Sequence, residues 1–117
     1  KMSIYFLNQF YMIYEFMRLV LFFDLPMKTK KEVKIYTHFR KYLIKSGFVM
    51  MQESVYCKLV QNSTMADAYI NNIKQNRPPA GLVQLLKVTE KQYAKMEYIV
   101  GHGKSNILDT DERLVII

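Results

Sequence analysis

The order of predicted elements along the sequence indicates an α+β domain in which strands and helices follow one another as β-α-β-β-α-β. Two observations predict this order: a continuous apolar run near the start, typical of a buried strand, and later segments that begin with helix-capping residues. The chain has 117 residues, of which 50% are hydrophobic and 23% are charged. This length and composition fit one folded domain and exclude a disordered chain.

The first predicted strand covers residues 19–23, a run of hydrophobic side chains such as a strand buried on both faces requires. The sequence Asp24-Leu25-Pro26 ends this strand. The first helix should begin at Thr29-Lys30-Lys31-Glu32, which has the spacing of a capping box, and stop at Gly47.

Two strands, at 48–51 and 55–60, follow the first helix, and a break, bulge or turn at 52–54 separates them. A second helix capped by Ser63 or Thr64 should run to about residue 76, where Arg77-Pro78-Pro79 closes it.

Residues 81–88 form the next predicted strand. Thr89-Glu90-Lys91-Gln92 is a second capping box and should open a short helix that reaches residue 96. Two final strands are expected at 97–100 and 113–117, around a polar loop. The full order is that of a ferredoxin-like βαββαβ sandwich with extra C-terminal strands.

Residues 1–16 are predicted to be an N-terminal extension ahead of a domain at 17–117. They are either a non-native remnant or an extra element that packs on a neighbour. Polar residues interrupt this apolar stretch, so it contains no membrane-spanning run and no signal-peptide cleavage site. The single cysteine, Cys57, excludes a disulfide framework and a cysteine-cluster metal site within one chain, and it fits an intracellular location.

The charge of the chain is concentrated in one segment. The formal net charge is +7, and residues 28–47 alone carry seven Lys and Arg residues against one Glu. A basic segment of this kind indicates a polyanionic partner, nucleic acid before an acidic membrane. Its members Lys30, Lys34, Lys41 and Lys45 should form a stripe opposite the apolar residues of the first helix.

Such a stripe is either an ordinary solvated face or a surface that contacts the backbone of a nucleic-acid duplex. The scarcity of acidic residues favours the second interpretation, with binding that depends on salt and tolerates any sequence. Lys28 and Lys31 lie at the start of the same helix, where the helix dipole also favours phosphate. Weaker candidates for contact with DNA are the isolated cations Arg18, Arg77 and Lys104.

Asp24 is the candidate metal ligand. A carboxylate at the end of a central strand can meet its symmetry mate across a two-fold axis, and Mg²⁺ would suit such a pair. The simpler alternative is an aspartate that only caps the turn before Pro26. His38 and His102 have no partner at ligand spacing, so solvent or packing explains both of them.

Short motifs in a specific order and spacing resemble the Cas-two (Cas2) family of small CRISPR-associated adaptation proteins, and most closely its type II branch. The resemblance covers about residues 12–117 and rests on the following segments: Met17-Arg18-Leu19-Val20-Leu21-Phe22-Phe23-Asp24-Leu25-Pro26, Phe39-Arg40-Lys41-Tyr42-Leu43, Gly47-Phe48-Val49-Met50, Gln52-Glu53-Ser54-Val55-Tyr56 and Leu86-Lys87-Val88-Thr89-Glu90-Lys91-Gln92.

The resemblance implies a cytoplasmic, ferredoxin-like homodimer. One such dimer bridges two dimers of the Cas-one integrase and holds a double-stranded prespacer DNA for insertion into a CRISPR array. It also implies that Asp24 occupies the position of the family's metal-binding acidic residue, with Mg²⁺ at the dimer interface. The C-terminal strands are expected to pair across the dimer.

Two functions from different classes therefore remain at this stage. The first is a non-catalytic, DNA-binding scaffold subunit of the spacer integration complex. The second is a Mg²⁺-dependent ribonuclease or deoxyribonuclease in which paired Asp24 carboxylates hold the metal, an activity for which the family is also catalogued. A third class, a ferredoxin-like regulatory or toxin domain, is disfavoured by the ordered motifs.

Overall fold

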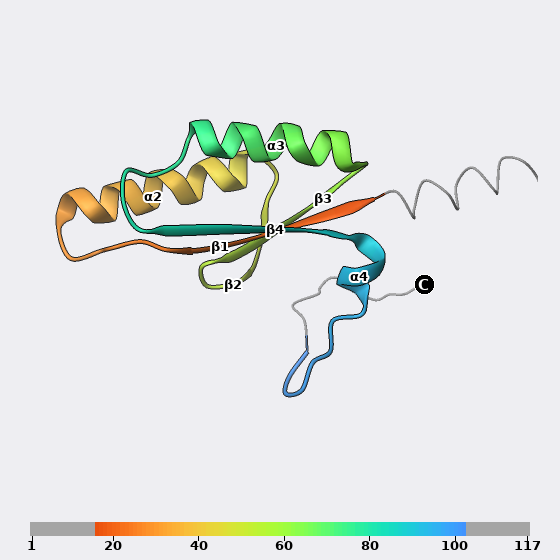
Figure 1. Ribbon diagram of the computed structural model, residues 1–117. Coiled ribbons are helices and arrows are strands. Elements are labelled where there is room, and N and C mark those ends of the chain that lie inside the picture. The colour runs from red at the N-terminus through yellow and green to blue at the C-terminus, as the bar shows by residue number, and fades with distance from the viewer. Residues whose placement is uncertain (1–15, 103–117) are drawn as a thin grey trace, which may run out of the picture.

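The computed structural model describes residues 16–102. Its elements, in chain order, are β1 (Met17–Asp24), α2 (Lys30–Lys45), β2 (Val49–Gln52), β3 (Val55–Val60), α3 (Ser63–Gln75), β4 (Leu82–Thr89) and α4 (Glu90–Ala94). This order confirms the α+β class and is compatible with the ferredoxin-like arrangement (Figure 1).

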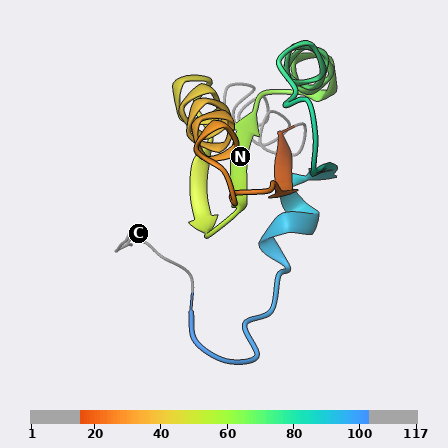
Figure 2. The same ribbon diagram turned by 90° about the vertical axis from the view of Figure 1, so that its left-hand side faces the viewer.

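The four strands form one antiparallel sheet in the order β2-β3-β1-β4. The central strand β1 pairs along its length with both neighbours, so that Val20 lies between Cys57 and Leu86. Helices α2 and α3 cover one face of the sheet, whereas α4 lies on the other side (Figures 1 and 2). The face opposite α2 and α3 is called the open face below.

The hydrophobic core lies between the sheet and the two long helices. Alternate β1 residues Leu19, Leu21 and Phe23 point into it and are at most 4% exposed. Phe39 and Leu43 of α2 meet them, and the rings of Phe23 and Phe39 pack edge to face with centroids 5.5 Å apart. Side chains two residues apart on a strand, or four residues apart on a helix, point to the same side, which explains why these residues share one core.

The open face is less covered than the apolar run of β1 predicts. Phe22 is 39% exposed, and the same face carries Leu86 of β4, at 51%, and Leu59 of β3, at 42%. The expectation that the first strand is buried on both faces is therefore wrong for the second half of β1. The sequence pattern is that of a doubly covered strand, but α4 covers only part of this face.

Two local predictions are corrected by the structure. Residues 97–100 are not a strand: Ile99 and Val100 are 87% and 91% exposed and lie in a segment that extends away from the sheet (Figure 1). Their apolar character predicts a strand, but no neighbouring strand of the described chain pairs with them. The cap of α3 is Asn62, whose side chain accepts a hydrogen bond from the backbone N–H of Met65, and not Ser63 or Thr64.

Other boundaries differ little from the expected ones. The short helix α4 ends at Ala94, two residues before the predicted end. The predicted strand at 113–117 and the extension at 1–15 lie outside the described residues. Between residues 16 and 102, no helix combines the length and the apolar character needed to cross a membrane.

Candidate nucleic-acid interface

The capping box of α2 forms as predicted and determines where the acidic residue of this helix lies. Thr29 Oγ1 accepts a hydrogen bond from the Glu32 N–H at 3.1 Å. Glu32 Oε1 in turn accepts from the backbone N–H groups of Lys28, at 2.9 Å, and Thr29, at 3.0 Å. The carboxylate of Glu32 is thus held at the helix N-terminus, where it complements the helix dipole and leaves the lysines further along the helix without an acidic neighbour in sequence.

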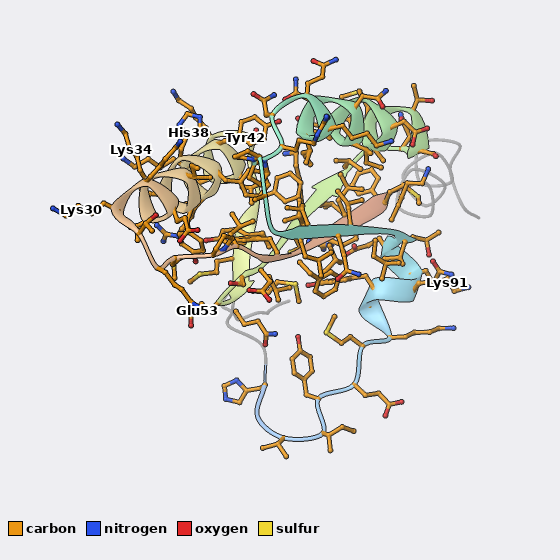
Figure 3. The ribbon with its side chains drawn as sticks, turned by 60° about the vertical axis from the view of Figure 1, so that its left-hand side comes forward. Lys30, Lys34, His38, Tyr42, Glu53 and Lys91 are labelled. Atoms are coloured by element: carbon orange, nitrogen blue, oxygen red, sulfur yellow. The ribbon has the colours of Figure 1, made fainter. Side chains whose placement is uncertain are left out.

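The four lysines of the predicted stripe are all exposed, while Phe39 and Leu43 on the opposite side of α2 are buried. These residues, called the lysine stripe below, extend along the whole helix and are Lys30, Lys34, Lys41 and Lys45. Figure 3 shows Lys30 and Lys34 projecting away from the sheet. At 1.5 Å per residue the stripe is about 22 Å long. This length matches about six base pairs of a duplex, at 3.4 Å per pair.

Arg77 joins this basic surface, although the sequence marks it as an isolated cation. It follows α3 in the turn to β4, and it lines one groove together with Lys31, Lys34 and His38 of α2. This space, called the α2–turn groove below, has a volume of about 560 Å³. Only the packing of α3 beside α2 brings these residues together, so no local sequence signal could have paired them.

Asp24 lies at the exposed end of β1 on the open face, opposite Leu82 of β4. It lines a small cavity of about 190 Å³ whose other polar members are Ser54 and Gln84. Carboxylate, hydroxyl and amide oxygens are ligands that Mg²⁺ accepts, so this donor set fits the ion in kind. Within residues 16–102, however, no group of three His, Cys, Asp or Glu side chains could hold a metal ion. Asp24 therefore contributes one carboxylate per chain, and a pair requires a second copy.

Arg18 lies on the open face, across the sheet from the lysine stripe. Its guanidinium forms two hydrogen bonds to the Glu90 carboxylate, at 2.6 and 2.8 Å, and lies 4.3 Å from the centre of the Tyr93 ring. Burial opposes its charge, but the hydrogen bond and the charge of Glu90 outweigh burial and raise the pKa of Arg18. The structure gives Arg18 the role of anchoring α4 to the sheet.

The same anchor contains Cys57, the single cysteine of the chain. Its buried Sγ lies 3.8 Å from both the Arg18 guanidinium and the Tyr93 hydroxyl. Burial and the adjacent Cys57 raise the pKa of Tyr93 to about 12. The exposed cations Lys28 and Lys31 remain near the start of α2 as predicted, whereas Lys104 lies outside the described residues.

Comparison with known proteins gives consistent matches along the folded part of the chain. The family model described as CRISPR associated protein Cas2 matches residues 17–96. A CRISPR-associated endoribonuclease Cas2 of Treponema denticola is 57% identical over 101 residues, which are 86% of this chain and 100% of that protein. A protein of the same name from Streptococcus mutans UA159 is 46% identical over 101 residues, 86% of this chain and 93% of the relative.

Proposed function

The chain belongs to the CRISPR associated protein Cas2 family, and from this membership and the basic face of α2 we propose that it is the DNA-binding scaffold subunit of a CRISPR spacer integration complex. In this role a dimer of the chain bridges dimers of the Cas-one integrase and holds the prespacer duplex. The integrase joins the strands, and the chain itself carries out no chemical step.

The lysine stripe is the observation that carries this proposal. Its four exposed cations follow one helix face, and the carboxylate of Glu32 is held at the end of that helix by its capping box. Flexible ammonium groups neutralise phosphates without reading base edges. A surface of this kind binds any duplex sequence, which suits a subunit that must accept arbitrary foreign DNA.

The open face supports the proposed homodimer. Its exposed apolar side chains include Phe22, Leu82 and Leu86, and Phe22 lines one hollow with Leu82 and another with Leu86. Contiguous apolar surface of this kind is unusual on a monomer and is typical of an interface. Packing two open faces across a two-fold axis would bury these residues and bring the two Asp24 ends of the sheet to the same interface, where Mg²⁺ would be held between carboxylates.

The alternative function is a Mg²⁺-dependent endonuclease, acting on RNA or DNA. The name endoribonuclease of the Treponema denticola relative favours it, as does the position of Asp24 beside the Ser54 hydroxyl and the Gln84 amide in one cavity. Mg²⁺, when bound, would activate water and stabilise charge on the phosphate. Asp24 would hold the ion, but one carboxylate per chain is a small set of ligands for this chemistry.

Spacer integration by the reconstituted complex separates the two functions. Asp24→Ala and the isosteric Asp24→Asn should leave integration near the wild-type rate, whereas removing two charges of the stripe with Lys41→Ala and Lys45→Ala should lower it. Sizing of each variant controls for loss of the dimer. Collapse of integration in both Asp24 variants, with dimer and duplex binding intact, would refute the scaffold proposal and favour metal chemistry.

A further inference from the structure

The α2–turn groove differs in composition from the lysine stripe beside it. Its base is apolar: Ile35 is half-buried, Phe39 is 2% exposed, and Pro78 and Pro79 form the opposite wall. Cations surround this base, with Lys31 and Lys34 on α2 and Arg77 on the turn. No carboxylate is among the described residues that line it. The groove therefore offers an apolar surface with an anion-binding rim, whereas the stripe offers charge alone.

Two planar side chains belong to this groove, one on each wall. His38 projects from α2 near Lys34, as Figure 3 shows, and both side chains line the groove. Arg77 stands on the facing turn, where its Nη1 donates to the carbonyl oxygen of Lys74 at 2.8 Å and so fixes the guanidinium against the end of α3. An imidazole ring and a guanidinium plane are both groups on which an unpaired nucleobase stacks.

One hydrogen bond joins α2 to α3 beside the groove, and a second one orders the C-terminal end of α3. The Tyr42 hydroxyl donates to Asn72 Oδ1, and Asn76 Nδ2 donates to the backbone carbonyl of Asn72 at 2.8 Å. Asn76 itself lines the groove. The spacing of the two walls is thus set by the fold, which lowers the entropy lost when a ligand enters.

We infer that the α2–turn groove binds one unpaired nucleotide of a nucleic-acid strand, with its base between His38 and Arg77 and its phosphate at Lys31 and Lys34. A volume of about 560 Å³ lies in the range of small-ligand sites and suits a single nucleotide. A base pair within a duplex keeps its faces stacked on its neighbours and cannot occupy the groove. The inference rests on the proposed function, since Lys34 belongs both to the groove and to the duplex-binding stripe.

The chemistry of the groove distinguishes a nucleotide from an acidic peptide. Both would satisfy the cations, but a carboxylate side chain makes no use of the two planar groups or of the apolar base between them. A nucleotide engages the cationic rim and the planar walls at once, with its phosphate and its base. Recognition of a single strand by the groove thus adds to the proposed duplex binding by the lysine stripe.

The test compares a short oligothymidylate with an abasic strand of the same length, which carries the same phosphates without bases. The wild-type protein should bind the thymidylate strand about 5- to 150-fold more tightly, the range expected for stacking of one base. His38→Ala should remove most of this difference, and His38→Phe, which keeps an aromatic ring, should retain it. Lys41→Ala, a change on the stripe outside the groove, should weaken both strands equally.

Further arms of the experiment separate this inference from the proposed function. An oligouridylate tells whether the strand taken up is DNA or RNA, and a blunt duplex reports on the lysine stripe alone. Normal duplex binding together with equal affinity for the base-bearing and abasic strands would refute the inference and leave the proposed function standing. Absence of duplex binding would refute the proposed function itself. Displacement of the thymidylate by polyglutamate at equal charge would assign the groove to an acidic protein partner and overturn the inference.

Discussion

Removal of one lysine from the middle of the stripe should change the salt dependence of duplex binding by a predictable amount. Each phosphate that a lysine neutralises contributes about 0.9 to the slope of log affinity against log salt concentration. Four contacts from Lys30, Lys34, Lys41 and Lys45 give a slope of about 3.6. Between 50 and 200 mM salt, this slope corresponds to a loss of affinity of about 150-fold.

Lys41→Ala should therefore reduce the slope by about 0.9 and lower affinity most strongly at low salt. Fluorescence anisotropy of a labelled duplex across a salt series measures this slope directly, and two unrelated duplex sequences should give the same value. Lys41→Arg keeps the charge and should keep the slope.

The matched control is Lys95→Ala, which removes an exposed lysine that follows α4, on the other side of the sheet from α2. This variant loses the same charge, so any effect of net charge alone would appear in it. An equal fall of the slope in Lys41→Ala and Lys95→Ala would show diffuse attraction rather than contact with the stripe. An unchanged slope in Lys41→Ala would exclude that lysine from the interface.

Three further predictions concern stability. Leu43→Ala should cost about 2 to 5 kcal/mol in chemical denaturation, because this side chain is fully buried, whereas Ile44→Ala beside it, at 48% exposure, should cost far less. Gly81→Ala should lower the melting temperature more than Gly101→Ala: both glycines have positive φ, but only at Gly81 would the new Cβ lie 2.7 Å from a leucine side chain. The fold raises the pKa of Tyr93 to about 12, above its ordinary value near 10. The stability contributed by the neutral side chain is therefore complete below pH 10 and is lost as the pH rises through 12. Over that range the denaturation midpoint of Tyr93→Phe should fall less than that of the wild type.

Local signals in the sequence predicted the parts of the fold that depend on neighbouring residues. Thr29 and Glu32, three residues apart, form the reciprocal side chain–backbone hydrogen bonds of a capping box, and Thr89 and Gln92 form the same bonds at α4. Both helix starts could therefore be predicted from the sequence. The cap of α3 is Asn62, one or two residues before the predicted Ser63 or Thr64, because all three side chains stand in a row and each can cap a helix. The opposition of lysines and buried Phe39 on α2 likewise follows from helical geometry alone.

The remaining features depend on contacts between distant segments, and no local pattern reports them. Arg18 stands as an isolated cation in the sequence, yet Glu90, 72 residues away, binds it because α4 packs onto the open face. The sequence marks Arg77 as an isolated cation and gives His38 no partner at ligand spacing, and the two residues share a groove only because α3 lies beside α2. Residues 97–100, three of which are apolar or aromatic, show the same difficulty, since their sequence predicts a strand without telling where its partner strand lies.

The distribution of charge explains how one small basic chain can bind both a duplex and a second copy of itself, as the scaffold proposal requires. The lysine stripe lies on the outer layer of helices, whereas Arg18 and Asp24 are the charged strand residues that the structure places on the open face. Arg18 is already neutralised by Glu90, so two open faces could approach without repulsion between unpaired cations. Because the sheet separates the two surfaces, a substitution in the stripe changes the surface for the duplex and leaves the surface for a second copy intact. The scaffold proposal requires this independence, since the dimer must persist while DNA binds and leaves.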